Sequence, residues 1–174
     1  MKKLTLTLLL FTTALIHAQD ERSSILTRKH EVKVGAVKLL AGPIFEGTYE
    51  YIHARDLTFG VAVLANLNTQ NDYYEDFSIT PFARFYFQEH KDFGGKGFFV
   101  EGFGKYSTGH NVFRDYEEAP KYSAAAVGLS LGYKWINRTG FVIEILTGFG
   151  RTLGNSDAAP DALFRGDLNL GYRF

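Results

Sequence analysis

Apolar and polar side chains alternate along the chain from residue 31 to its end, with a period close to two. The segment 164–174 is the clearest example. Every second residue from Phe164 to Phe174 is apolar or glycine, and the residues between them are charged, polar or glycine. A helix would mix these two sets on its surface, whereas a strand sends them to opposite faces. The pattern therefore predicts a β-strand at residues 164–174.

The same alternation recurs in six further segments, residues 45–52, 57–66, 77–87, 98–106, 122–135 and 141–150. A less regular eighth strand is predicted at Val32–Ala41, where the orientation of Lys38 is ambiguous. Turn-forming residues cluster between strands at 53–56, 94–97 and 137–140. Pro81 cannot donate a ladder hydrogen bond, so we expect a local bulge or an early strand start there. The pattern as a whole predicts an all-β fold, an eight-stranded antiparallel up-and-down barrel.

The N-terminus has the layout of a secretory signal peptide. Lys2 and Lys3 precede an apolar or threonine-containing run at residues 4–16, and Ala18 offers a small residue for cleavage. A run of this length is too short for a membrane-spanning helix, which needs about 20 apolar residues. We therefore expect three parts: a signal peptide at residues 1–18, a short periplasmic tail at 19–30 and the barrel at 31–174.

Two kinds of barrel fit the alternation, a transmembrane barrel and a soluble periplasmic barrel that binds an apolar ligand inside. One face carries aromatic rings and aliphatic side chains. The other carries small residues and six charges, namely Glu50, Arg84, Glu101, Lys134, Glu144 and Arg173. The interior of an eight-stranded barrel is only just wide enough for its side chains, so the second set suits it better. This choice turns the apolar face outward and predicts a transmembrane barrel.

The aromatic residues support the same choice, because they fall into two groups along the strands. The first group is Tyr51, Phe59, Phe85, Phe87, Phe98, Tyr133, Trp135, Phe141, Tyr172 and Phe174, and the second is Phe45, Phe77, Tyr106, Tyr122, Phe149 and Phe164. Two aromatic girdles around an apolar band are typical of transmembrane barrels. A soluble barrel has no physical reason for them.

The connections are consistent with this orientation in most places. Long connections are predicted at one end, residues 67–76, 107–121 and 151–163, and short ones at the other, residues 53–56 and 136–140. Long outer loops and short periplasmic turns are the tendency in such barrels. Two connections depart from it: the first outer one, near Gly42–Pro43, is expected to be tiny, and the inner one at 88–97 is long.

Composition excludes several classes of function. The chain holds 19 Lys and Arg against 19 Asp and Glu, so it has no basic surplus to attract nucleic acid. It contains no cysteine, which excludes disulfides, thiolate metal sites and cysteine nucleophiles. Aromatic residues make up 16% of the chain, which argues against disorder.

With these features the chain resembles the small outer-membrane β-barrels of Gram-negative bacteria. Its last residues are Gly171-Tyr172-Arg173-Phe174. In that class a last strand ending in Phe is read by the barrel assembly machinery, so the resemblance implies that Tyr172 and Phe174 form an assembly signal. It also implies residence in the cell outer membrane, among outer-membrane lipid.

More narrowly, residues 31–174 are similar to a family of uncharacterised barrels found mainly in Bacteroidetes. The shared motifs are Tyr49-Glu50, Pro81-Phe82-Ala83-Arg84-Phe85-Tyr86 and Phe99-Val100-Glu101. The family implies no established activity.

The inward charges are the sharpest candidate site. If the hairpin that joins residues 77–87 to 98–106 is symmetric, Arg84 and Glu101 face each other. The charges could form an ion path or a binding site in the lumen, or a paired network that fills the barrel. Buried charges are tolerated only when they are paired, which favours the network and predicts no stable pore. We thus expect a monomeric, non-enzymatic barrel with a structural or surface-interaction role. Its contact surface would be the outer loops, with Tyr73, Tyr74, Phe113, Tyr116 and Tyr122.

An alternative is an outer-membrane lipid-modifying hydrolase. Ser107 and His110 share an outer loop with Asp115, Glu117 and Glu118, which supplies a hydroxyl, a base and carboxylates. The spacing matches no known catalytic motif. The acidic runs 115–118 and 72–76 could hold a hard cation through oxygen, but neither has the spacing of a known calcium loop. We predict no cofactor, metal or catalytic site.

Overall fold

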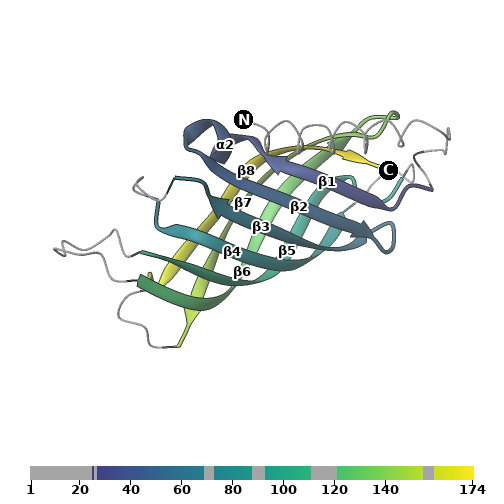
Figure 1. Ribbon diagram of the computed structural model, residues 1–174. Helices are drawn as coiled ribbons and strands as arrows, with labels where there is room; N and C mark the ends of the chain where they lie inside the picture. The colour runs from purple at the N-terminus through teal and green to yellow at the C-terminus, as the bar shows by residue number, and fades with distance from the viewer. Residues whose placement is uncertain (1–24, 26, 69–72, 88–92, 111–120, 155–158) are drawn as a thin grey trace, which may run out of the picture.

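A computed structural model describes residue 25 and residues 27–68, 73–87, 93–110, 121–154 and 159–174. The elements in this part of the chain are β1 (His30–Gly35), α2 (Ala36–Ala41), β2 (Ile44–Ile52), β3 (Leu57–Asn66), β4 (Glu75–Phe87), β5 (Gly97–His110), β6 (Lys121–Ile136), β7 (Phe141–Leu153) and β8 (Ala162–Arg173). Each strand pairs antiparallel with the next, and β1 pairs with β8 to close the barrel (Figure 1). The predicted eight-stranded antiparallel barrel is confirmed.

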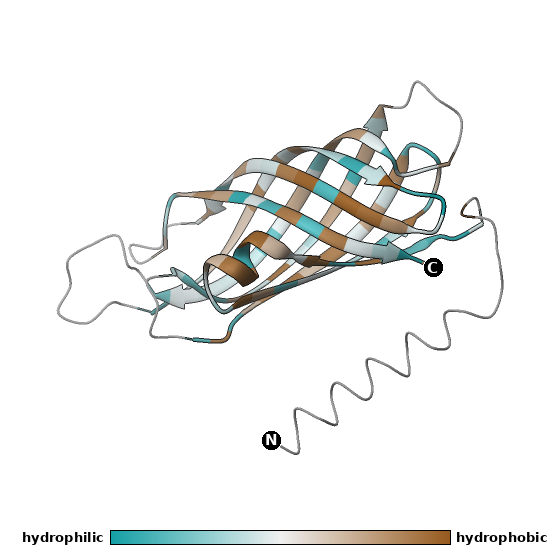
Figure 2. Cartoon of the chain, turned by 90° about the horizontal axis from the view of Figure 1, so that it is seen from above, coloured by the Kyte–Doolittle hydropathy of each residue, from teal (hydrophilic) through white to brown (hydrophobic). Residues whose placement is uncertain are grey.

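The strands present one apolar face and one polar face, as the period of two predicts. Along β7, exposed and buried residues alternate from Phe141 to Phe149. Phe149 is 70% exposed, whereas Glu144 is fully buried. Figure 2 shows the resulting apolar and polar positions side by side along each strand. The barrel is therefore apolar outside and largely polar inside.

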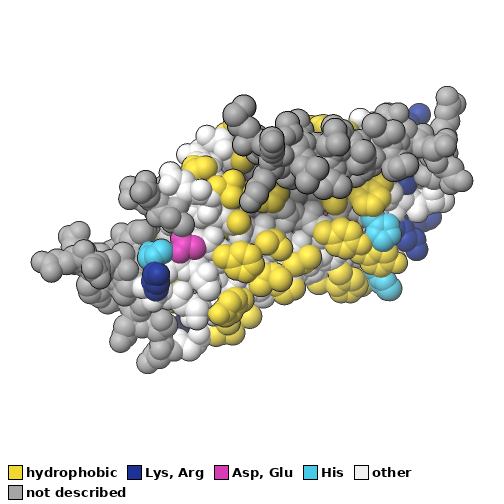
Figure 3. Space-filling model, in the orientation of Figure 1, with side chains coloured by type: hydrophobic (Ala, Val, Ile, Leu, Met, Phe, Trp, Pro, Cys, Tyr) yellow, Lys and Arg dark blue, Asp and Glu magenta, His cyan; other side chains and the backbone are white. Residues whose placement is uncertain are grey.

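Outward aromatic side chains lie near both ends of the barrel wall. Phe164 near the start of β8 and Phe174 directly after its end are both exposed, and Leu168 and Leu170 lie between them on the same face. At about 3.4 Å per residue and a tilt of about 40°, the distance between these two rings along the barrel axis is about 25 Å. Figure 3 shows hydrophobic side chains over the middle of one face, with basic and His side chains toward its two ends.

The expectation of a single strand at Val32–Ala41 is wrong. Strand β1 ends at Gly35, and helix α2 follows at once. The sequence of α2 contains Ala, Leu and Lys, which have high helix propensity. The backbone N–H of Val37 also donates a hydrogen bond to Asp167 Oδ1 over 3.0 Å. The first outer connection is therefore this helix plus Gly42–Pro43 rather than a tiny turn.

Two smaller expectations are also wrong. Pro81 lies opposite Val61 of β3, and the β4–β5 register is the same before and after it. The pairing with β5 is interrupted beside Pro81, but the register shift lies between Glu75 and Phe77.

Tyr122 was expected in the second of the two outward aromatic groups. It is instead 6% exposed and points inward, because it shares the face of Lys134 along β6.

The predicted signal peptide at residues 1–18 and most of the tail at 19–30 lie outside the described residues. Of the tail, Ile25 packs against Ile136 and Val142 at one end of the barrel, beside Phe93. No helix in the described segments is long and apolar enough to cross a membrane.

Candidate functional site

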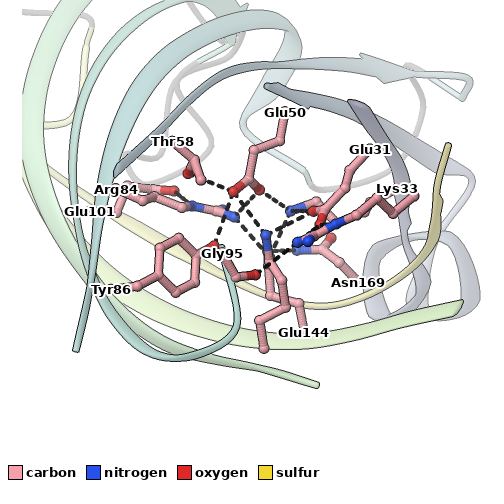
Figure 4. Close-up of polar contacts among 12 residues, drawn as sticks. Glu31, Lys33, Glu50, Thr58, Arg84, Tyr86, Gly95, Glu101, Glu144 and Asn169 are labelled. Atoms are coloured by element: carbon pink, nitrogen blue, oxygen red, sulfur yellow. Dashed lines mark hydrogen bonds and ion pairs between the residues drawn. The ribbon is translucent and has the colours of Figure 1, made fainter. Parts of the chain in front are cut away.

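The interior of the barrel contains a balanced set of charges. Among the described residues, seven acidic and six basic residues are buried, namely Glu31, Glu46, Glu50, Glu75, Glu101, Glu144, Asp167, Lys33, Arg84, Lys105, Lys134, Arg165 and Arg173. A seventh base, Lys38 of α2, lies at the edge of the interior with its ammonium against two of these carboxylates. Figure 4 shows the central part of this network.

Glu50 of β2 is the most heavily contacted carboxylate. Its donors come from five different residues on four strands: Lys33 (2.5 Å), Thr58 (2.6 Å), Arg84 (2.6 Å), Tyr86 (3.0 Å) and Lys134 (2.8 Å). A buried carboxylate needs such partners to offset the loss of hydration. Glu50 therefore joins β1, β3, β4 and β6 through the centre of the lumen.

Arg84 of β4 connects three carboxylates. Its Nε donates to Glu101 Oε2 over 2.7 Å, and its Nη1 lies 2.6 Å from Glu50 and 2.7 Å from Glu144. Phe82 and Phe99 flank the guanidinium, with ring centroids 4.3 and 4.5 Å from Cζ. Pairing and cation–π contact together hold this charge away from water.

The network extends to the end of the barrel where the chain terminates. Lys134 donates to Glu31 over 2.8 Å, and Arg173 Nε donates to the same carboxylate over 2.7 Å. Arg173 also donates to the carbonyls of Gly94 and Gly95, at 2.7 and 3.0 Å. Gly95 has a φ of +64°, a left-handed conformation that glycine adopts readily. These hydrogen bonds from Arg173 hold the turn before β5 at this end of the lumen.

A second set of pairs continues toward the end that carries α2. Glu101 accepts a hydrogen bond from Arg165 Nε over 3.0 Å, and Arg165 lies 3.4 Å from Glu46. Glu46 in turn pairs with Lys38 of α2. Close by, Lys105 pairs with Glu75. Ion pairs therefore run along most of the length of the interior.

Apolar side chains lie in the interior beside the charges. Phe82, Phe103, Ala126 and Leu163 form one buried cluster, and Tyr86, Phe99 and Leu146 form another. Cavities of about 350 and 290 Å³ lie near opposite ends of the barrel, and Glu50 lines neither. The arrangement can hold the wall together and block the lumen.

The six charged residues singled out from the sequence all lie in this interior. Arg84 and Glu101 face each other in the β4–β5 register, as the symmetric hairpin requires. The sequence analysis missed Glu31 and Lys33, because the facing of the first strand was ambiguous. Both residues alternate with Val32 and Val34 along the sequence, and this alternation could have placed them on the inner face. The pattern placed Arg165 and Asn169 on the polar face of residues 164–174, opposite Phe164 and Leu168, but they were not included in the charge network.

The structure does not bring together the pair considered for hydrolysis. Ser107 is buried and points inward, whereas His110, an odd number of residues along β5, lies on the other face. The ring Nδ1 of His110 instead lies 2.9 Å from Asp76 Oδ2. Residues 115–118 lie outside the described part, as does Asp72. Within the described ranges, no group of three or more His, Asp or Glu side chains is placed to hold a metal ion.

Searches of protein-family models, of curated proteins and of solved structures find no match to this chain.

Proposed function

We propose that this protein is an integral outer-membrane β-barrel with a closed lumen and a structural or surface-interaction role. The observation that carries the proposal is the inverted distribution of side chains. Leu129 is 66% exposed on the outer wall, whereas Arg84 and Glu50 are buried in the centre. A soluble barrel gains its stability from the opposite arrangement.

The apolar exterior supports a membrane location. The outward-facing side chains of β4 to β8 are mainly Phe, Leu, Ile, Val and Tyr, with aromatic rings toward both ends. Continuous apolar surface of this extent is rare on soluble monomers and marks contact with lipid or protein. An outward band about 25 Å tall between aromatic girdles is the expected surface of a transmembrane barrel.

The interior supports a closed barrel without enzymatic activity. An eight-stranded wall leaves room for side chains but no aqueous channel. Here the central charges are paired with one another, and the two apolar clusters occupy the space beside them. We infer that the network fixes the barrel shape rather than conducting ions.

The outer loops are the proposed contact surface. Tyr73 and Tyr74, at the end of the β3–β4 connection, have ring centroids 5.1 Å apart, which gives a compact aromatic patch. The opposite end carries the proposed assembly signal, Tyr172 and Phe174. Phe174 exchanges two backbone hydrogen bonds with His30 and stacks on its ring. The proposed partners are outer-membrane lipid and, during biogenesis, the barrel assembly machinery.

Fractionation combined with heat-modifiability tests this proposal. We expect the protein in the outer-membrane fraction after a urea wash, with a gel mobility that changes on boiling. Protease added to whole cells should cut within residues 107–121. Recovery in the soluble periplasmic fraction, with one gel mobility, would instead support a soluble barrel that binds an apolar ligand.

A further inference from the structure

Basic side chains surround a cavity of about 290 Å³ at the end of the barrel where the chain terminates. Figure 3 shows Lys, Arg and His side chains together at this end, which carries the C-terminus in Figure 1. The basic residues in the lining are Arg28, Lys29, Arg55 and Arg173. Among the described residues, no Asp or Glu lines the cavity. Its volume is at the small end of the range for ligand pockets, about 300–1,000 Å³.

The cavity has a buried floor and an exposed rim. Ile52 of β2 and Arg173 of β8 are buried inside the barrel. Lys29, just before β1, and His53 and Arg55, in the β2–β3 turn, are exposed. A lining of both kinds reaches from the interior of the barrel mouth to solvent, so a small molecule can enter without crossing the charge network.

Two of the guanidinium groups are held in place by the backbone around them. Arg28 Nη1 donates to the carbonyl oxygens of Thr139 and Arg173, over 2.9 and 3.3 Å, and to the Tyr172 hydroxyl over 3.0 Å. Its Cζ also lies 5.8 Å from the centre of the Tyr172 ring. Arg173 is fixed by the two carbonyls of the turn before β5. Side chains that are already ordered lose little entropy when a ligand binds.

Positive charge is in excess around the cavity among the described residues. The carboxylate that pairs with Arg173 is Glu31, which accepts a hydrogen bond from Arg173 Nε over 2.7 Å and from Lys134 Nζ over 2.8 Å. One negative charge is thus shared by two cations. Asp56, which follows Arg55 in the β2–β3 turn, is not among the lining residues, and neither is the terminal residue Phe174. The lining is therefore suited to an anion.

The lining favours a phosphate monoester among the small anions. A guanidinium presents a planar fork of N–H donors that matches two oxygens of a phosphate or a carboxylate. A phosphate monoester carries between one and two negative charges near pH 7, whereas a carboxylate carries one, so the phosphate gains more from several bases. Ile25, Ile52, Ala54 and Phe93 make up the apolar part of the lining. This part offers contact to an organic group attached to the phosphate.

We propose that this cavity is a binding site for a phosphate monoester. The basic lining residues surround the phosphate, and the apolar ones contact its organic group. The ester is either a soluble molecule or the head group of a lipid such as phosphatidic acid, because both present the same chemical group. The inference goes beyond the proposed function and does not depend on it, since the lining belongs to the barrel mouth and not to the outer wall.

Calorimetric titration of the folded full-length barrel in dodecyl maltoside tests the site. The probes are phenyl phosphate, inorganic phosphate and benzoate, which separate the contributions of the phosphate and of the organic group. Arg55→Gln removes a base from the rim of the cavity. Arg138→Gln removes an exposed arginine from another turn at the same end and is the matched control. Lys29→Gln is a second variant of the lining, and heat-modifiable mobility checks that each variant is folded.

We expect one phenyl phosphate per protein, bound more tightly than inorganic phosphate or benzoate. Arg55→Gln should weaken its binding about tenfold, the effect of losing one hydrogen bond to a charged group. Arg138→Gln should change the affinity less than about twofold, because an exposed charge outside the cavity is screened. Lys29→Gln should weaken binding as well, and it replaces Arg55→Gln in the comparison if that variant does not fold.

Competition distinguishes the two sources of the phosphate. Phosphatidic acid added to the micelles should displace phenyl phosphate if the natural ligand is a lipid head group, and should leave it bound if the ligand is soluble. Absence of saturable binding, or an equal loss in Arg55→Gln and Arg138→Gln, would overturn the site and leave the proposed membrane barrel intact. Benzoate binding as tight as that of phenyl phosphate would overturn the assignment to a phosphate.

Discussion

Arg84 and Glu101 face each other on neighbouring strands inside the barrel, with Arg84 Nε 2.7 Å from Glu101 Oε2. Both side chains are fully shielded from solvent. The same guanidinium also contacts Glu50 and Glu144, so its removal would leave three buried carboxylates short of a cation. We therefore expect the loss of Arg84 to destabilise the interior more than the loss of any other charge.

We therefore expect Arg84→Met to destabilise the folded barrel by about 3–5 kcal/mol, the usual cost of breaking a buried ion pair. The measurement is guanidinium unfolding of protein folded in lipid vesicles. Arg138→Met, in the exposed turn before β7, is the control and should cost less than about 0.5 kcal/mol. Equal stability of the two variants would show that the network makes no net contribution to the free energy of unfolding.

A second prediction concerns the close approach of Gly132 to Phe99. A Cβ at Gly132 would lie 2.4 Å from Phe99 Cζ and 2.6 Å from the Ile145 carbonyl oxygen. Gly132→Ala should therefore cost about 1–3 kcal/mol, because the neighbouring strand must shift. At Gly104 no atom lies within 4 Å of an added Cβ. Gly104→Ala should leave the unfolding midpoint unchanged or raise it. A stable Gly132→Ala variant would contradict the interior packing described above.

The faces of the strands were predictable from the sequence, because a period of two needs no tertiary information. The pairing of Arg84 with Glu101 was predictable as well, since one hairpin joins their strands. The end of β1 was not predictable. It depends on Asp167, which lies 130 residues from Val37 in the chain and bonds its N–H.

The pairs of charged residues that meet across the lumen could not be predicted from the sequence either. Lys134 meets Glu31 over a separation of 103 residues. Which charges meet in this way is set by the stagger of all the strands in the closed barrel, and not by any local pattern.

Charge placed on the outer wall should be tolerated only near its ends. Ile145 is outward and lies midway between Phe141 and Phe149, whereas Leu153 is outward at the end of β7. In lipid vesicles we expect Ile145→Arg to cost about 2–4 kcal/mol and Leu153→Arg about 0–1 kcal/mol. Arg151 already occupies an outward position close to Leu153. If both variants are equally stable, the middle of the wall is not in contact with hydrocarbon.

The proposed closed lumen predicts that the protein does not conduct ions. Protein inserted into planar bilayers should give no steady single-channel current, because an eight-stranded barrel leaves room for side chains but no aqueous channel, and paired charges and apolar clusters occupy the centre here. A reproducible unitary conductance would contradict the closed lumen, though it would leave the membrane location in place.

The proposed assembly signal predicts a phenotype in cells. Phe174→Ala should lower the fraction of barrel with heat-modifiable mobility, because the terminal ring is the proposed contact for the assembly machinery. Phe164→Ala removes an outward ring from the opposite end of β8 and is the control. Equal assembled fractions for the two variants would show that Phe174 is not part of an assembly signal.

The proposal that the outer wall faces a membrane is tested most directly through Trp135, the sole tryptophan of the chain, which is outward on β6. The measurement is quenching of its fluorescence in vesicles of phosphatidylcholine brominated at different depths of the acyl chain. We predict strong quenching by bromines near the interface, and in Trp135→Phe/Ile145→Trp protein a quenching maximum shifted to bromines deep in the chain. Quenching by aqueous iodide, with no effect of brominated lipid on either protein, would contradict the account.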